Sequence, residues 1–147
     1  MPDTPTVVTV DLRWSDLDAL RHVNNVQFLR LLEEARIKAF HDWLGPVRRS
    51  NGLLVAHAEI DYLDQLHFRG QAVAVHLWVS RVAGASFDTS YELYDSPEPE
   101  ARLCARALTT QVAFDMTDQK PVRIPDDLRE ILNSRSGAPV PMKRRGA

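Results

Sequence analysis

The chain has 147 residues, a formal net charge of -2 at pH 7, and a composition of 44% hydrophobic and 26% charged residues. This length is enough for one domain with a sizeable core, and the composition excludes a mainly disordered chain. The small net charge argues against capture of nucleic acid by bulk electrostatic attraction. We therefore expect a single globular domain that has no nucleic acid among its partners.

Cys104 is the one cysteine of the chain, which excludes an internal disulfide and a thiolate metal cluster. The first residues, MPDTPTVVTVDLRW, lack the positive start and the apolar segment of a secretory signal. No apolar run approaches the ~18 residues that a membrane span needs. These features predict a cytoplasmic protein that does not cross a membrane. The histidines show neither HxH nor HExxH spacing, so no metal site is expected.

The first predicted elements are a strand and a long helix that are joined by a polar loop. Val7 to Arg13 alternates between apolar and polar residues, as a strand does. A helix is expected from Asn24 or Asn25, because Asn is a favoured N-cap, to just before the stop signal Gly45-Pro46. The apolar residues of this helix recur at helical spacing: Phe28, Leu31, Leu32, Ala35 and Ala39.

Another side of this helix carries charged residues. Arg30 and Glu34, and Glu34 and Lys38, are four positions apart, a spacing at which opposite charges attract across one helical turn. We expect this side to face solvent or an interface.

Four further strands are predicted between residues 53 and 115, where apolar residues recur with a period of two. The expected strands are Leu53 to Leu63, Ala72 to Arg81, residues 87–93 and residues 102–114. One early helix followed by strands with short turns favours an antiparallel sheet packed on that helix. The predicted fold class is therefore α+β.

The C-terminal region is expected to add one short helix and a tail. The helix is predicted over Asp126 to Leu132, directly after Pro125. The residues from Ser134 onward are rich in Pro, Gly, Arg and Lys, a composition typical of a loose segment. We therefore place one domain at residues 1–133 and a loose tail at residues 134–147.

The loop before the long helix concentrates polar side chains. Asp16, Asp18, His22, Asn24 and Asn25 fall within ten positions. A helix N-terminus carries unpaired N–H groups and the positive end of the helix dipole, so it can stabilise negative charge on a carbonyl oxygen. A carboxylate beside it can attack the same carbonyl, or activate a water molecule to do so. This loop is the candidate active site.

The stretch DLDALRHVNNVQFLRLLEEAR resembles the signature of hotdog-fold acyl-CoA thioesterases of the 4-hydroxybenzoyl-CoA thioesterase type. Similarly, AHAEIDYLDQLHFRGQAVAV resembles the second and third strands of that family, and FDMTDQKPVRIPDDLR resembles its closing segment. The resemblance implies a long central helix wrapped by a curved antiparallel sheet of about five strands. It also implies protomers that pair edge to edge as a homodimer, or as a homotetramer made of two dimers.

The resemblance implies roles for individual residues of the loop. Asp18 matches the catalytic carboxylate of the family, and Asp16 matches the other Asp of the pair, which we interpret as positional. The backbone N–H of Asn25 matches the donor that polarises the thioester carbonyl. His22 and Asn24 match the polar run of the signature, and we assign them to shaping the site.

Three positions depart from the family pattern. Arg21 stands where many relatives carry Gly, Phe28 stands where Tyr is usual, and Ala83-Gly84-Ala85 lacks the basic cluster of some relatives. Arg21 can narrow the pocket, meet an anionic group of the substrate, or simply lie exposed on a loop. Phe28 removes a hydroxyl from the site. The phosphates of coenzyme A are left to other groups, with Arg69, Arg81 and the basic tail as candidates.

The sequence thus predicts a thioesterase that hydrolyses an acyl-CoA or aroyl-CoA, with Asp18 as nucleophile or general base. A thioester is already activated, so a positioned carboxylate and an oxyanion donor suffice, and no cofactor or metal is expected. The alternatives are a hotdog module that binds an acyl thioester or a partner protein without turnover, a thioesterase for acyl carrier protein, and a hydratase of the same fold. The length of the acyl group is not predicted, because two protomers would share the pocket.

Overall fold

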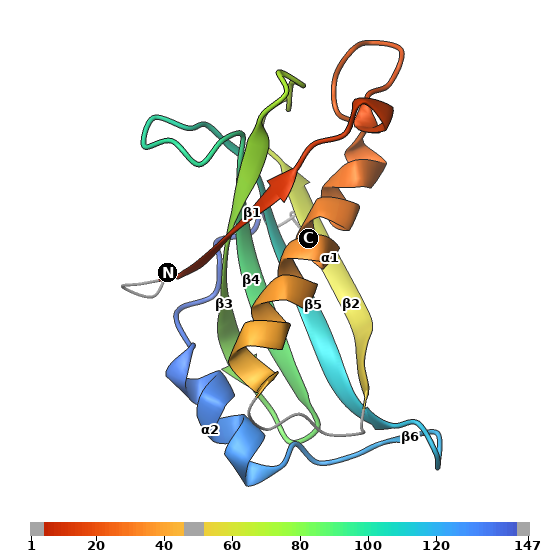
Figure 1. Ribbon diagram of the computed structural model, residues 1–147. Helices are drawn as coiled ribbons and strands as arrows, with labels where there is room; N and C mark the ends of the chain where they lie inside the picture. The colour runs from red at the N-terminus through yellow and green to blue at the C-terminus, as the bar shows by residue number, and fades with distance from the viewer. Residues whose placement is uncertain (1–4, 46–51, 144–147) are drawn as a thin grey trace.

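The structure is a computed structural model that describes residues 5–45 and 52–143. A long helix lies across a curved antiparallel sheet, and a shorter helix covers one end of it (Figure 1). In chain order the elements are β1 (Thr6–Asp11), the 3₁₀ turn η1 (Trp14–Asp16), α1 (Asn25–Leu44), β2 (Gly52–Tyr62), β3 (Ala72–Val82), β4 (Ser86–Tyr94), β5 (Leu103–Asp115), β6 (Lys120–Pro121) and α2 (Asp126–Ser134).

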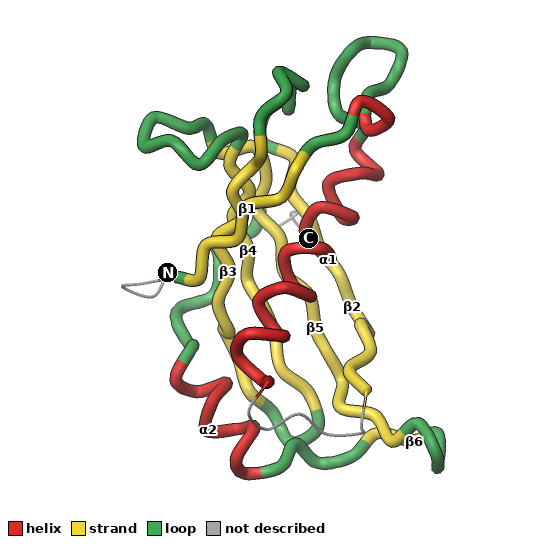
Figure 2. Tube along the Cα trace, viewed as in Figure 1, coloured by secondary structure: helices red, strands yellow, loops and turns green. Residues whose placement is uncertain are grey.

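The sheet confirms the predicted fold class and the hotdog architecture. Its strand order is β1-β3-β4-β5-β2, with β6 paired to β5, and all these pairings are antiparallel. The sheet curves around α1, and connecting loops gather at its two ends (Figure 2). The predicted strand bounds differ from the observed ones mainly at the first strand, which ends at Asp11 because Arg13 already caps η1.

Helix α1 begins and ends where the sequence predicts. Asn24 is the N-cap residue, and its Oδ1 accepts a hydrogen bond from the Val26 N–H at 3.1 Å. Gly45 is the C-cap residue, and Pro46 lies outside the described residues. The five apolar residues predicted for the core face are all buried, and Trp43 joins them. The indole N–H of Trp43 donates to Thr6 Oγ1 at 3.0 Å, which fixes the end of α1 against β1.

The face of the sheet beneath α1 is lined by buried side chains that pair across strands β3 and β4. Val75 lies opposite Leu93, and Leu77 lies opposite Tyr91; all four are fully buried. Burial of apolar side chains contributes roughly 25 cal/mol per Å² of apolar area. This packing holds α1 on the sheet and so positions the loop that precedes the helix.

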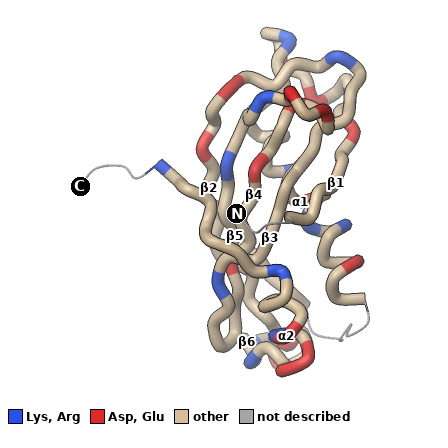
Figure 3. The backbone as a smooth tube through the Cα atoms, turned by 90° about the vertical axis from the view of Figure 1, so that its left-hand side faces the viewer, with Lys and Arg blue, Asp and Glu red and all other residues tan. Residues whose placement is uncertain are grey.

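The opposite face of the sheet is crossed by the segment after α2. The Trp78 indole N–H donates to the Ala138 carbonyl at 2.7 Å, and the Val140 N–H donates to Ser90 Oγ at 3.1 Å. The Lys143 N–H reaches Asp61 Oδ2 at 2.6 Å, so the described part of this segment ends beside β2 (Figure 3). The sequence predicts a domain boundary at residue 133 with a loose tail; residues 135–143 contact the sheet, and the boundary itself stays a prediction.

Candidate active site

The loop between η1 and α1 is closed by its own backbone. The Asp18 N–H donates to the His22 carbonyl at 2.9 Å, and the Arg21 N–H donates to the Asp18 carbonyl at 3.1 Å. The Val23 N–H donates to the carbonyl of Leu66 at 2.8 Å, beyond the end of β2. These bonds hold the polar loop between the start of α1 and the end of β2.

Asp18 is half-buried, and its carboxylate is oriented by backbone amides. Its Oδ1 accepts from the Leu20 N–H at 2.9 Å and from the His22 N–H at 3.3 Å. Among the described residues, Oδ2 has no hydrogen-bond partner. One carboxylate oxygen is therefore held in place, and the other is open to a water molecule or a substrate.

Asn25 is the first residue of α1, where backbone N–H groups lack helical partners. The Val26 N–H is bonded to the Asn24 side chain, and the Gln27 N–H to the Asn24 carbonyl. The Asn25 N–H has no partner within the described part of the chain. Its availability matches the role of oxyanion donor, and that role stays a prediction.

These two groups line one pocket of about 570 Å³. Its walls are the polar loop, the first turns of α1 and residues 62–66. It brings together five of the seven predicted site residues: Asp18, His22, Asn24, Asn25 and Phe28. The pocket therefore combines an open carboxylate oxygen with an unpaired amide at a helix N-terminus.

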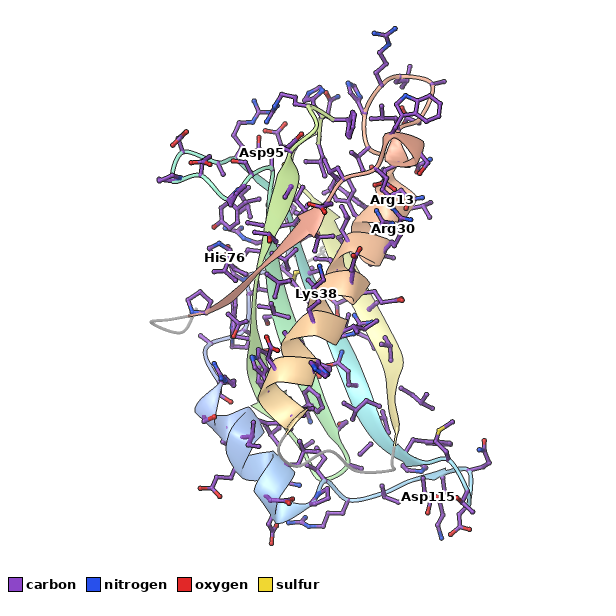
Figure 4. The ribbon with its side chains drawn as sticks, viewed as in Figure 1. Arg13, Arg30, Lys38, His76, Asp95 and Asp115 are labelled. Atoms are coloured by element: carbon purple, nitrogen blue, oxygen red, sulfur yellow. The ribbon has the colours of Figure 1, made fainter. Side chains whose placement is uncertain are left out.

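Asp16 lies outside this pocket, and its contacts are those of a buried structural residue. It is 3% exposed, and its Oδ2 accepts from the Arg13 N–H at 2.8 Å and from Arg30 Nη2 at 2.7 Å. Arg30 lies on α1, and Arg13 lies next to it at the start of η1 (Figure 4). The predicted ion pair of Arg30 with Glu34 is present at 3.0 Å. The link to Asp16, fourteen positions away, has no local spacing signal and was not predicted.

Arg21 is exposed and lies on the far side of the loop. Its backbone has φ 61°, the left-handed region. It lines a second pocket of about 880 Å³ together with Trp14 and Phe68, and Asp18 lines both pockets. The structure therefore separates Arg21 from the pocket that holds Asn25.

The end of β2 and the segment after it complete the pocket, although no sequence pattern indicated this. The Tyr62 hydroxyl donates to the Asn25 carbonyl at 3.2 Å, and its ring meets Phe28 edge-on at 5.2 Å between ring centroids. The His67 ring meets His22 in the same manner at 4.8 Å. These residues follow Asp18 by more than forty positions and are brought to it by the fold.

Cys104 lies close to this segment, and its thiol is 3.7 Å from the Gln65 carbonyl oxygen. Burial raises the pKa of the Cys104 thiol to about 11, and the carboxylates of Asp95 and Asp64 act in the same direction. The thiol is therefore protonated near neutral pH and is a poor nucleophile.

No metal ligand set or membrane helix is found in residues 5–45 and 52–143. Within these ranges no three His, Cys, Asp or Glu side chains gather closely enough to hold a metal ion. No helix there is long and apolar enough to cross a membrane. Arg69, one candidate for the phosphates of coenzyme A, is exposed and lies 3.5 Å from Asp95, and its role stays a prediction.

The long helix on a curved antiparallel sheet defines a protein of the hotdog class. Residues 12–132 match the family model of the thioesterase-like superfamily, and the chain belongs to this superfamily. Thioester hydrolysis is the activity that this membership supports. No curated protein matches the chain in sequence.

Solved structures of thioesterases resemble the protein over nearly its whole length. A thioesterase from Thermus thermophilus, complexed with coenzyme A and Zn, is 30% identical with a TM-score of 0.72, over 91% of this chain and 96% of that chain. A predicted thioesterase from Bacillus stearothermophilus is 24% identical with a TM-score of 0.80, over 93% and 100%. A 1,4-dihydroxy-2-naphthoyl-CoA thioesterase from Synechocystis is 23% identical with a TM-score of 0.72, over 86% and 94%. The last two show likeness of fold alone.

Proposed function

We propose that the protein is an acyl-CoA thioesterase, with Asp18 as nucleophile or general base and the Asn25 N–H as oxyanion donor. The observation that carries this proposal is the pairing of an open Asp18 oxygen and the unpaired Asn25 amide in one pocket. The products are the free acid, of an acyl or aroyl group, and CoA. The Thermus thermophilus thioesterase, which is 30% identical, is complexed with coenzyme A, and this supports CoA as the carrier.

The chemistry follows from these two groups. The Asn25 N–H donates to the thioester carbonyl oxygen, and the helix N-terminus stabilises the negative charge that develops there. Asp18 either attacks the carbonyl carbon and forms a mixed anhydride as the thiolate leaves, which water then hydrolyses to the free acid and the Asp18 carboxylate, or takes a proton from a water molecule that attacks. Acid-base catalysis contributes roughly 10² to 10⁴ in rate, and one oxyanion donor roughly 10² to 10³.

The proposal is tested by thiol release from a panel of acyl-CoA and aroyl-CoA thioesters. We expect the wild type to release thiol, and Asp18→Asn to lose about 100-fold or more of that rate because the amide is neither base nor nucleophile. The matched control is Asp118→Asn, in the turn after β5, where the Asp118 N–H bonds to Asp115 Oδ1. Asp115 marks this turn at the end of the molecule opposite Arg13 (Figure 4).

Each other outcome points to a different conclusion. Retention of most of the rate by Asp18→Asn contradicts the role of Asp18. Saturable binding of the thioesters without thiol release favours the non-catalytic binding module. Faster hydrolysis of acyl thioesters of acyl carrier protein than of CoA thioesters indicates that acyl carrier protein is the preferred carrier. We keep the homodimer or homotetramer and the cytoplasmic location as parts of this proposal.

A further inference from the structure

The end of β2 brings a hydroxyl group to the start of α1. Tyr62 is the last residue of β2, and it lines the same pocket as Asp18 and Asn25. Its hydroxyl donates to the Asn25 carbonyl at 3.2 Å. A residue of the sheet thus holds the very residue whose N–H is the proposed oxyanion donor.

Tyr62 is restrained from two sides, although its side chain is 43% exposed. The hydroxyl is bonded to α1, and the ring leans edge-on against Phe28, with 68° between the ring planes. Phe28 is 2% exposed, so it is a rigid support. An exposed tyrosine can satisfy its hydroxyl with water, and this one reaches the helix instead.

The bond matters because the N–H of the first residue of a helix has no partner within the helix. Helix ends fray, and the Asn25 N–H has no partner among the described residues. Preorganisation of an oxyanion donor requires that its direction be held before the charge develops. The carbonyl and the N–H of Asn25 share one Cα, so a bond at the carbonyl limits the motion of the N–H.

We infer that Tyr62 is a positioning residue, whose hydroxyl holds the Asn25 N–H in the direction of the substrate carbonyl oxygen. This inference rests on the proposed function of the pocket. Phe28, the aromatic residue of α1 in this pocket, has no hydroxyl, and the group therefore comes from the sheet. Tyr62 acts through Asn25 and needs no proton transfer of its own.

The test is Tyr62→Phe, which keeps the ring against Phe28 and removes the hydroxyl alone. A neutral hydrogen bond contributes about 0.5–1.5 kcal/mol, so we expect kcat to fall about threefold to tenfold. KM should stay within about twofold, because the donor acts mainly on charge in the transition state. The shape of the pH–rate profile should not change, since the tyrosine is not a proton donor or acceptor in the reaction.

A second measurement needs no activity. The ¹⁵N order parameter of the Asn25 amide should fall in Tyr62→Phe from the ~0.85 of a rigid backbone. The matched control is Tyr94→Phe, because the Tyr94 hydroxyl bonds to Glu92 at 3.4 Å and lies away from the pocket. That variant should leave both kcat and the Asn25 order parameter unchanged.

Wild-type kcat in a Tyr62→Phe variant that folds normally overturns the inference. A rise in KM alone also overturns it, because Tyr62 would then contact the substrate rather than position Asn25. Failure of the proposed function looks different: the wild type releases no thiol, or Asp18→Asn keeps its rate. The order parameter of Asn25 still tests the restraint by Tyr62 in that case.

Discussion

Arg21 shows how one residue can carry the strain of a tight loop. Its φ of 61° costs a residue with a Cβ about 1–2 kcal/mol relative to ordinary conformations. The chain must turn back sharply at Arg21 because the Asp18 N–H donates to the His22 carbonyl within this short loop. Gly is the residue that adopts this left-handed backbone without strain.

We expect Arg21→Gly to be more stable than Arg21→Ala by about 1 kcal/mol. Both variants lose the same side chain, which is exposed, but only Gly adopts φ 61° without strain. The greater flexibility of unfolded Gly offsets part of this gain. Urea unfolding of the two variants measures the difference. Equal stability, or greater stability of Arg21→Ala, contradicts the strain at this position.

At the scale of elements, the start of α1 is positioned by contacts on two sides. On one side, Arg30 of α1 binds the buried Asp16 of η1 at 2.7 Å. On the other side, Tyr62 of β2 bonds to the Asn25 carbonyl. The Asn24 side chain caps the same end of the helix. Three elements therefore meet at the start of α1, and the helix N-terminus is held relative to the carboxylate loop.

Substitution of Arg30 should lower the free energy of unfolding more than substitution of its exposed partner Glu34. Arg30→Met leaves Asp16, which is 3% exposed, with the Arg13 N–H but without its counter-charge. Breaking a buried pair costs about 3–5 kcal/mol, and because the Arg30 side chain is 26% exposed we expect about 2–4 kcal/mol. The control Glu34→Gln removes the exposed ion pairs of Glu34 with Arg30 and Lys38 and should cost at most about 1 kcal/mol.

Urea unfolding of Arg30→Met and Glu34→Gln, under the same conditions, makes this comparison. If the two variants lose similar stability, the Asp16–Arg30 pair does not have the structural role that its burial indicates.

The two edges of the sheet differ at the scale of the whole molecule. β1 and β2 are the outer strands of the main strand order. β2 has eleven residues, and residues 54–59 are all exposed. A long exposed edge strand invites pairing with another strand, and pairing about a twofold axis removes that liability. This observation supports the edge-to-edge homodimer of the proposed function, with β2 as the paired edge.

A lysine on β2 should weaken this dimer. Val55 of β2 is 47% exposed in the protomer and Val7 of β1 is 51% exposed, so Val55→Lys and Val7→Lys are matched changes that the fold tolerates. We expect Val55→Lys to shift the protein toward monomer, because the charges of two protomers would meet at the interface. Val7→Lys should not. Sedimentation velocity at micromolar concentration measures both.

A monomeric wild type contradicts this assembly. If Val7→Lys dissociates the dimer and Val55→Lys does not, the dimer interface lies at β1 and not at β2.

Local patterns were sufficient for the elements, and one short motif supplied most of the candidate site residues. The start of α1 follows from Asn24 as a cap, and the strands follow from alternation of apolar residues. Asp18 and Asn25 were identified through a motif that spans few positions, so their closeness is set by the chain itself. They line one pocket as expected, and their catalytic roles remain to be tested.

Contacts between residues far apart in the sequence could not be predicted from local patterns. The pair of Asp16 with Arg30 depends on how η1 docks on α1, and the bond of Tyr62 to Asn25 depends on where β2 ends beside the helix. Periodicity assigns a residue to a face but carries no information on strand order, register or end-to-end placement. The local sequence thus determines the polar loop that carries the candidate catalytic residues. Which distant residues contact and restrain this loop is determined by the tertiary packing.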